Sequence, residues 1–141
     1  MSTPTGYYTT GEEATVMVTD QATGGTKGRK VAQLGAIDAQ ALYTLAEVAG
    51  SGADKYSRDN YLAGYDWSLS YDALQRHALK WAAGQNRDDE SGLPHMAHVA
   101  WHALALVAFE LRDLGRDDRH ATTAALADLR DRLAAWVSPG L

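Results

Sequence analysis

The chain has 141 residues, enough for one domain that buries about two-thirds of the surface of its unfolded chain. Hydrophobic residues make up 45% of it and charged residues 22%, which is typical of a compact protein and argues against a disordered one. A net charge of −5 argues against binding to a nucleic-acid polymer, because that requires clustered positive charge, and the absence of cysteine excludes disulfides, thiolate nucleophiles and cysteine-ligated zinc.

Nothing in the sequence predicts attachment to a membrane. Residues 99–109 form the longest apolar stretch with almost no charge, and this stretch has about half the length that a membrane-spanning helix requires. Residues 1–8 lack the basic segment and following apolar segment of a secretory signal peptide. We therefore expect a cytoplasmic protein with no membrane partner.

The first 26 residues contain eight threonines and four glycines but no lysine or arginine, a composition that favours extended or irregular backbone. Within them, residues 15–19 are predicted to form a short strand. Lys27, Arg29 and Lys30 follow among glycines and predict a mobile cationic loop, although an ordinary solvated turn fits them equally well. We expect an irregular N-terminal segment at residues 1–26 and a single helical domain at residues 27–141.

Apolar residues spaced three and four apart predict a first helix at residues 34–48, ended by Gly50 and Gly52. A second helix is predicted to begin at Ser70, a good N-cap, and to end before Gly84, which suits the position after a helix end. Its buried stripe is predicted to consist of Leu74, Ala78 and Trp81, with His77 on the same face.

A third helix is predicted from Pro94, which suits a first turn, to Asp113, just before Gly115. The last helix is predicted to start near Asp118 or Thr122, to contain leucines at helical spacing and to be stopped by residues 138–140. Four helices of this length with short connections predict an all-α, four-helix bundle-like domain.

Residues 70–111 hold four of the five histidines and form the predicted reaction centre. Residues 88–90 are three adjacent carboxylates just before the third helix, and His95 and His98 lie one turn apart at its start. Carboxylates suit Mg²⁺ or Mn²⁺, Mn²⁺ also accepts imidazole, and a helix N-terminus favours phosphate. The pattern therefore predicts a site for a metal-bound phosphate. Two simpler explanations stay open: the carboxylates as a solvated helix cap, and the histidines as polar residues between helices.

Several other motifs for hydrolysis are absent. The sequence has no His-Glu-x-x-His of zinc proteases, no His-Asp dipeptide of HD-type phosphohydrolases and no phosphate-binding P-loop. Residues 52–61, in contrast, are rich in groups that bind phosphate or stack on a base. Glu47, close to the end of the first predicted helix, is either a surface residue or a metal ligand.

Several motifs together resemble the phage dATP/dGTP diphosphohydrolases, a family grouped with the MazG-like all-α nucleotide pyrophosphatases. They are, in chain order, Gly52-Ala53-x-Lys55-Tyr56, Arg58-x-Asn60-Tyr61, Arg76-His77-x-x-x-Trp81-x-x-Gly84 and Asp88-x-Glu90-Ser91-Gly92-x-x-His95-x-x-His98. The resemblance covers residues 27–109. It departs from the MazG-like pattern, since no Glu-x-x-Glu occurs and Gln85 stands where the family often has glutamate.

The resemblance implies an enzyme that cleaves dGTP or dATP between the α and β phosphates with Mg²⁺ or Mn²⁺, and that supplies dGMP for 2-aminoadenine nucleotides in some phages. We hypothesise that His77 orients or deprotonates the attacking water, with Glu90 as a second catalytic residue. The predicted metal ligands are Asp88, Glu90, His95, His98 and, ranked lower, Glu47. The predicted substrate contacts are Lys55, Arg58 and Arg76 for the phosphates, and Tyr56, Asn60 and Trp67 for the base.

A homodimer or homotetramer is expected, because a domain of this size leaves loops rich in aromatic residues uncovered. For a phage protein, the cytoplasm would be that of the host. The alternative to an enzyme is a non-catalytic helical module that binds a nucleotide or another protein, with the histidines in structural roles.

Overall fold

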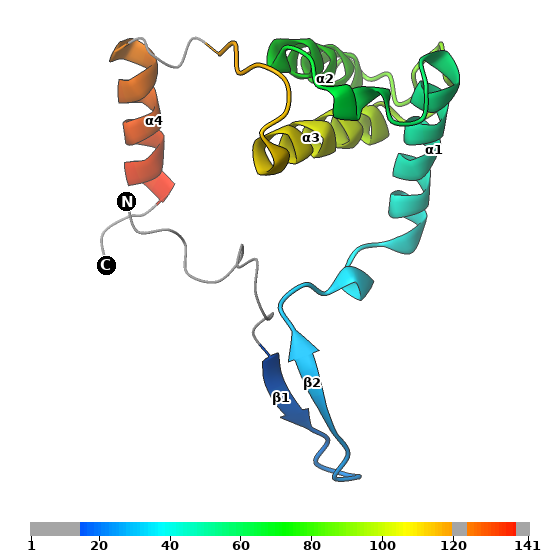
Figure 1. The fold of residues 1–141 in the computed structure, drawn as a ribbon, viewed down its shortest axis with the longest axis vertical. Coiled ribbons are helices and arrows are strands. Elements are labelled where there is room, and N and C mark those ends of the chain that lie inside the picture. Colours follow the sequence, from blue (N-terminus) through cyan, green and yellow to red (C-terminus); the bar gives the residue numbers. More distant parts are fainter. Residues whose placement is uncertain (1–14, 120–123, 138–141) are drawn as a thin grey trace. The chain divides into compact units, whose positions relative to one another are not determined.

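The computed structural model describes residues 15–119 and 124–137 (Figure 1). The chain divides into two compact units, Met1–Leu42 and Tyr43–Leu141. The described elements are β1 (Thr15–Thr19), β2 (Thr26–Lys30), the 3₁₀ turn η1 (Leu34–Ala36), α1 (Ala39–Lys55), the 3₁₀ turn η2 (Asn60–Ala63), α2 (Trp67–Ala82), α3 (His95–Arg112) and α4 (Ala124–Val137). The predicted helical class is confirmed, and the predicted domain boundary at residue 26 stays a prediction.

The N-terminal unit contains an antiparallel hairpin of β1 and β2, with Val16 opposite Arg29. The predicted strand at residues 15–19 is therefore confirmed, whereas the prediction of a mobile loop at Lys27, Arg29 and Lys30 is wrong, because these residues form β2. The connecting turn explains the pairing. The Asp20 carboxylate accepts hydrogen bonds from two backbone N–H groups of the turn, at 2.8 and 3.0 Å, and fixes its shape.

Helix α1 is shifted along the chain relative to the prediction. The carboxylate of Asp38 accepts a hydrogen bond from the Ala41 N–H at 2.8 Å, so the helix begins just after this residue. The prediction that Gly50 and Gly52 end the helix is wrong, since it continues to Lys55. A glycine inside a helix costs about 1 kcal/mol relative to alanine. Burial of the same helix, where Val48 is 3% exposed, offsets part of that cost.

Helix α2 begins at Trp67, and Ser70 is buried in its first turn, so the prediction of Ser70 as the N-cap is wrong. The caps come from a segment that follows α3. The Asp118 carboxylate accepts a hydrogen bond from the Ser68 N–H at 2.9 Å, and the carbonyl of Arg116 accepts one from the Trp67 N–H at 3.0 Å. These partners satisfy the free N–H groups at the helix start.

The far end of α2 agrees with the prediction in one respect and differs in another. Gly84 follows the helix end with φ = 97°, as predicted for the residue after a C-cap. The predicted burial of Trp81 is wrong, because its side chain lies in the last turn of the helix and is 49% exposed.

Helix α3 packs against α2 and contains most of the buried core (Figure 1). It follows Pro94 and ends at Arg112, after which Asp113 adopts a left-handed conformation, so the predicted bounds are confirmed. Phe109, Ala105 and His95 on this helix are fully buried. The burial of a histidine rather than an aliphatic residue indicates that this contact has polar partners.

A close backbone approach joins the segment before α2 to the segment after α3. Gly64 and Gly115 both have positive φ, 82° and 71°, and a Cβ atom on either would overlap the backbone of the other segment. The N–H of Arg116 also donates to the carbonyl of Tyr65 at 3.3 Å. Tyr65 is therefore held at a fixed position beside both helices.

The last helix, α4, contains the predicted leucines between Ala124 and Val137. The predicted stop at residues 138–140 and the predicted start at Thr122 lie outside the described residues. Among the helices that the structure describes, none combines the length and the apolar character needed to cross a membrane.

Candidate functional site

Two adjoining cavities lie in the unit Tyr43–Leu141. The first, which we call the aromatic cavity, has a volume of about 480 Å³ and is lined by Tyr56, Tyr61, Tyr65 and Trp101, among others. The second, the histidine cavity, has a volume of about 710 Å³ and is lined by His77, Asp88, Glu90, Ser91, His98 and three cationic side chains, Lys55, Arg76 and Lys80. Four larger side chains line both cavities: Tyr56, Arg76, Trp101 and His102.

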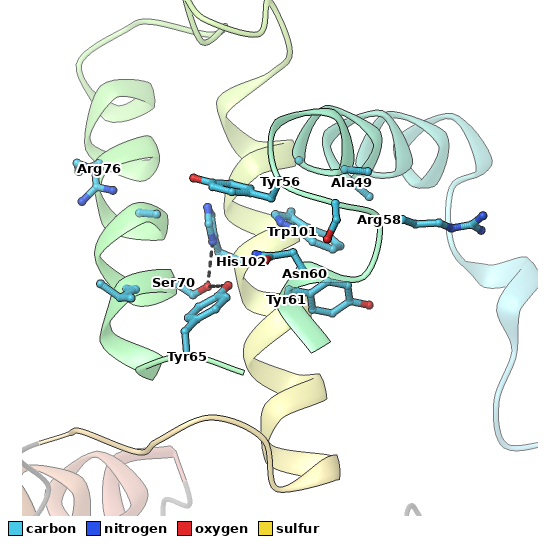
Figure 2. Close-up of a pocket in the computed structure, with 15 residues that line it drawn as sticks. Ala49, Tyr56, Arg58, Asn60, Tyr61, Tyr65, Ser70, Arg76, Trp101 and His102 are labelled. Carbon is cyan, nitrogen blue, oxygen red and sulfur yellow. Dashed lines mark hydrogen bonds between the residues drawn. The ribbon is translucent and has the colours of Figure 1, made fainter. Parts of the chain in front are cut away.

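The aromatic cavity is walled by the end of α1, by η2 and by the facing sides of α2 and α3 (Figure 2). Tyr61 meets Trp101 edge to face, with ring centroids 4.9 Å apart, so both rings are held by packing. Small residues of α1, including Ala49 and Gly52, leave the space open. A cavity of this size with aromatic walls suits a flat ring such as a nucleobase.

A tight turn at residues 86–95 places the carboxylate of Asp88 beside α3. Asp88 Oδ2 accepts hydrogen bonds from both the N–H and the hydroxyl of Ser91, each at 3.0 Å. The turn closes through the N–H of His95, which donates to the carbonyl of Asn86 at 2.9 Å. Gly92 has φ = 71°, a conformation that favours glycine.

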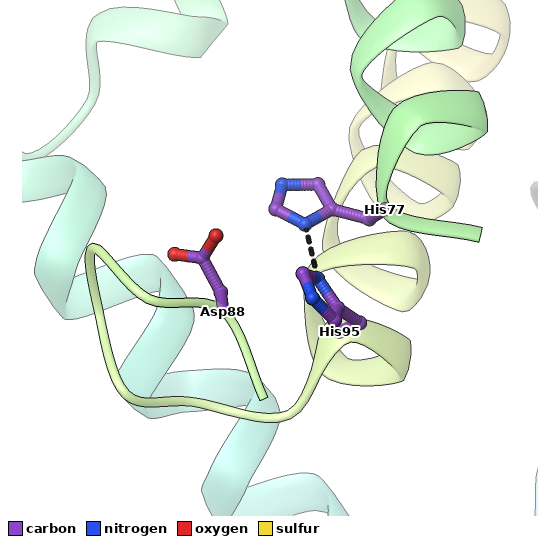
Figure 3. Close-up of side chains that lie close together, drawn as sticks. All are labelled: His77, Asp88 and His95. Atoms are coloured by element: carbon purple, nitrogen blue, oxygen red, sulfur yellow. Dashed lines mark hydrogen bonds between the residues drawn. The ribbon is translucent and has the colours of Figure 1, made fainter. Parts of the chain in front are cut away.

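A chain of hydrogen bonds connects Gln85, His95 and His77 (Figure 3 shows the two imidazoles). His95 Nε2 lies 3.1 Å from Gln85 Oε1, which only accepts, so this nitrogen carries the proton. His95 Nδ1 then accepts the proton of His77 Nδ1, 2.9 Å away. The remaining nitrogen of His77, Nε2, therefore keeps its lone pair, and His77 lines the histidine cavity.

His98 stacks on His77 and is bonded to the acidic turn. The two rings are nearly parallel, with centroids 4.3 Å apart. Ser91 Oγ lies 2.8 Å from His98 Nε2 and donates its own proton to Asp88, so His98 donates to Ser91. His98 Nε2 is 3.9 Å from Asp88 Oδ2.

The pKa values follow from burial and from the neighbouring charges. Burial lowers the pKa of His77 and of His98. Burial, together with His77, His98 and Arg76, lowers the pKa of His102 to about 4. For Asp88, burial raises the pKa, but the hydrogen bonds from Ser91 and the nearby imidazoles outweigh it and leave the value below the ordinary one. Near neutral pH the cavity therefore presents neutral imidazoles and an ionised Asp88.

The donor atoms of His77, Asp88 and His95 fit a divalent cation, since one ligand atom from each lies within 4.8 Å of the others (Figure 3). Nitrogen and carboxylate oxygen are ligands that Mn²⁺ accepts, and the oxygen also suits Mg²⁺. A cation bound to both Nδ1 atoms would take the place of the proton that they share. Cation binding there and the hydrogen bond between the imidazoles therefore exclude each other.

The structure brings together most of the residues predicted for catalysis and metal binding. His77, Asp88, Glu90 and His98 line the histidine cavity. The Glu90 side chain is 79% exposed and pairs with Lys55 at 3.3 Å, which is a surface contact. His95 is fully buried, lines neither cavity and contacts His77 through its Nδ1 atom. Glu47 is exposed and lines neither cavity.

The residues predicted to contact substrate lie around both cavities, with one exception. Tyr56 and Arg76 line both, Lys55 lines the histidine cavity, and Arg58 and Asn60 line the aromatic cavity. Trp67 lines neither, because its indole N–H donates to the carbonyl of Leu114 at 2.9 Å.

Gln85, Ser91 and His102 take part in the site, although the sequence assigned them no role. Ser91 lies inside the predicted acidic turn, and His102 shares a helix face with His95 and His98, so spacing contained a signal for both. Gln85 stood out only as a replacement for the glutamate that the resembled family often has, and its contact with His95 depends on the fold of the turn.

Comparison with known proteins is consistent with this geometry. Residues 21–119 match the family described as dATP/dGTP diphosphohydrolase, N-terminal. A protein of Salmonella phage PMBT28 named dATP/dGTP diphosphohydrolase is 32% identical over 101 residues, which are 72% of this chain and 34% of the relative. The chain thus spans about one third of the length of the curated relative that it matches. No solved structure matches. The match over residues 21–119 shows that the chain belongs to the dATP/dGTP diphosphohydrolase N-terminal family.

Proposed function

We propose that this chain hydrolyses dGTP and dATP to the monophosphate and pyrophosphate with the help of a divalent cation. The observation that carries the proposal is the pair of adjoining cavities. One is lined by aromatic side chains, and the other by imidazoles, carboxylates and the positively charged side chains of lysine and arginine. A nucleoside triphosphate has the same division into an aromatic base and an anionic chain. The name of the phage relative, dATP/dGTP diphosphohydrolase, supports this substrate class.

The base occupies the aromatic cavity in this proposal, against the rings of Tyr56, Tyr61 and Trp101. Asn60 lines the same cavity and offers an amide that both donates and accepts hydrogen bonds, which suits the edge of a purine. The phosphates extend into the histidine cavity, where Lys55, Arg76 and Lys80 supply positive charge. Arg58 also lines the aromatic cavity, but its guanidinium group points away from the other lining side chains (Figure 2), so no phosphate contact is assigned to it.

His77 is the proposed proton acceptor. Its Nδ1 proton is committed to His95, so Nε2 keeps a lone pair that takes a proton from the attacking water. Water adds to the α-phosphorus, the bond from that phosphorus to the oxygen bridging to the β-phosphorus breaks, and pyrophosphate leaves with this oxygen. The lowered pKa of His77 leaves the imidazole neutral, and so able to accept, near pH 7.

Asp88, Glu90 and His98 are the proposed cation ligands that line the cavity. His95 joins them only if His77 gives up the shared proton, and the proposal does not depend on Glu47. When bound, the cation supplies positive charge against the phosphate oxygens and makes water more acidic. Without it, Lys55 pairs with Glu90, so cation binding at Glu90 would release Lys55 for a phosphate.

Self-association into a homodimer or homotetramer is a further part of the proposal. Large apolar side chains are exposed along the packed helices, including Leu79 at 67%, Val107 at 52% and Leu111 at 63%. Self-association would remove such side chains from water. On the resemblance alone, we also propose that the dGMP product serves the synthesis of 2-aminoadenine nucleotides.

The test is to incubate the protein with each dNTP and Mg²⁺ or Mn²⁺ in ¹⁸O-labelled water and to identify the products by mass spectrometry. We expect pyrophosphate and dGMP or dAMP, with ¹⁸O in the monophosphate, since water attacks the α-phosphorus. Label in pyrophosphate would refute attack at this position. Nucleotide binding without turnover under either metal would support the non-catalytic binding module instead.

A further inference from the structure

We propose that His102 donates a hydrogen bond from Nε2–H to the α-phosphate of the bound nucleotide, and that Ser70 is a positioning residue that holds the ring in the tautomer this requires. The inference rests on the proposed function and assigns a substrate contact and a specific protonated nitrogen to residues with no role so far. Its starting point is a hydrogen-bonded triad of Tyr65, Ser70 and His102, in which Ser70 is buried and the other two side chains are partly buried.

Ser70 is the centre of the triad and is 1% exposed. Its Oγ lies 2.6 Å from the Tyr65 hydroxyl and 3.2 Å from His102 Nδ1 (Figure 2). Tyr65 is fixed in turn by an edge-to-face contact with the buried ring of Phe109, with centroids 4.9 Å apart. The three groups come from the start of α2, the segment before it and the middle of α3, so the fold itself assembles them.

We assign the direction of the protons so that both hydroxyl protons are used inside the triad. Ser70 Oγ has one proton and can also accept, and the neutral imidazole of His102 has one protonated and one free nitrogen. Both hydroxyl protons are used within the triad when Tyr65 donates to Ser70 and Ser70 donates to His102 Nδ1. The imidazole proton is then on Nε2. Burial supports the neutral ring, since it lowers the pKa of His102 to about 4.

His102 lies where the two cavities meet, since it lines both together with Tyr56 and Arg76. Figure 2 shows the second ring nitrogen pointing away from Ser70, on the side of Tyr56. With the base in the aromatic cavity and the β and γ phosphates in the histidine cavity, the group between them is the α-phosphate. A fixed N–H at this point stabilises the negative charge that develops on the α-phosphate oxygens during attack.

Two substitutions of His102 test the donor directly. The side-chain nitrogen of glutamine occupies a position close to imidazole Nε2, whereas that of asparagine is closer to Nδ1. With dGTP and Mn²⁺ we expect kcat of His102→Asn to fall on the order of 100-fold, and kcat of His102→Gln to stay within about tenfold of wild type. If His102 had a purely structural role, the loss of kcat in the two variants would instead follow the loss in melting temperature.

Two further substitutions test the positioning role of Ser70. Ser70→Ala removes the donor to Nδ1, whereas Tyr65→Phe leaves the Ser70 hydroxyl free to donate to it. We therefore expect kcat to fall about tenfold in Ser70→Ala, and by a smaller factor in Tyr65→Phe. ¹⁵N-edited NMR of the His102 ring, without nucleotide, reports the tautomer independently of activity. Wild type and Tyr65→Phe should show Nε2–H, and Ser70→Ala a mixture of tautomers.

The results separate this inference from the proposed function. A wild-type protein that hydrolyses no dNTP overturns the proposed function and the phosphate contact together. A wild-type protein that hydrolyses dGTP, but whose His102 carries its proton on Nδ1, overturns the inference alone. So does equal loss of kcat in His102→Gln and His102→Asn at equal melting temperatures.

Discussion

The neutral, partly buried imidazole of His102 predicts a specific pH dependence of stability. Its pKa is about 4 in the folded chain, against 6.5 for an unperturbed histidine, because burial and the nearby His77, His98 and Arg76 disfavour the charged form. The unfolded chain therefore binds this proton more tightly than the folded chain does. The free energy of unfolding must fall as the pH drops from 6.5 towards 4, and this contribution is fully present above pH 6.5.

The magnitude follows from the difference in pKa. One pKa unit corresponds to about 1.4 kcal/mol, so the shift of His102 amounts to about 3 kcal/mol once the pH is well below 4. At pH 4.5 most of that loss, about 2.5 kcal/mol, is already expected. The values for His77 and His98 are lowered in the same direction and add to the effect in the wild-type protein.

The assay compares urea unfolding of wild type and His102→Gln at several values between pH 7.5 and pH 4.5. Glutamine does not titrate, so the difference between the two proteins isolates His102 while other groups largely cancel. We expect the wild type to lose about 2 to 3 kcal/mol more than the variant over this range. Parallel curves for the two proteins would contradict the burial of a neutral imidazole at this position.

Three other substitutions test separate parts of the structure. Glu90→Gln should abolish dNTP hydrolysis while the melting temperature stays within a few degrees, because the Glu90 side chain is 79% exposed. Glu110→Gln, on an exposed part of α3, is the matched control for activity. Unfolding of the Glu90 variant would instead show that this residue is needed for the fold. Phe109→Ala should lower the free energy of unfolding by about 3 to 5 kcal/mol in urea titrations, since the ring is fully buried, and a loss below about 1 kcal/mol would contradict its place in the core. Asp118→Ala should lower the midpoint of urea unfolding through loss of the cap on α2, and an unchanged midpoint would show that the cap contributes nothing.

The sequence predicted helix ends correctly where residues next to the end determine them. Pro94 precedes α3 as expected, because proline fixes its own backbone angle, and the helix ends at Arg112, next to the expected end at Asp113. The start of α2 was not predictable in this way. It depends on Asp118, which is 50 residues away from Ser68 in the sequence. Gly50 lies inside α1 although it resembles a helix end, because a glycine costs a helix only about 1 kcal/mol and does not by itself stop it.

The candidate site shows the same difference between features set by local spacing and features set by distant contacts. Spacing predicted that His95 and His98 lie one turn apart at the start of a helix. In the structure both rings lie beside His77, and so does the ring of His102. The partners that fix their protons were not predictable. In the sequence, Ser70 indicated only an N-cap role and Gln85 only a difference from the family pattern, and their contacts with the histidines exist only once the turn and α2 have packed against α3.

The most direct measurement of the central claim is a crystal structure with an α,β-methylene analogue of dGTP and Mn²⁺, using the anomalous signal of manganese. The account predicts the guanine in the aromatic cavity, the phosphates among Lys55, Arg76 and His102, and a manganese peak within bonding distance of the Asp88 carboxylate. A nucleotide bound outside both cavities, or manganese bound away from Asp88, would contradict it.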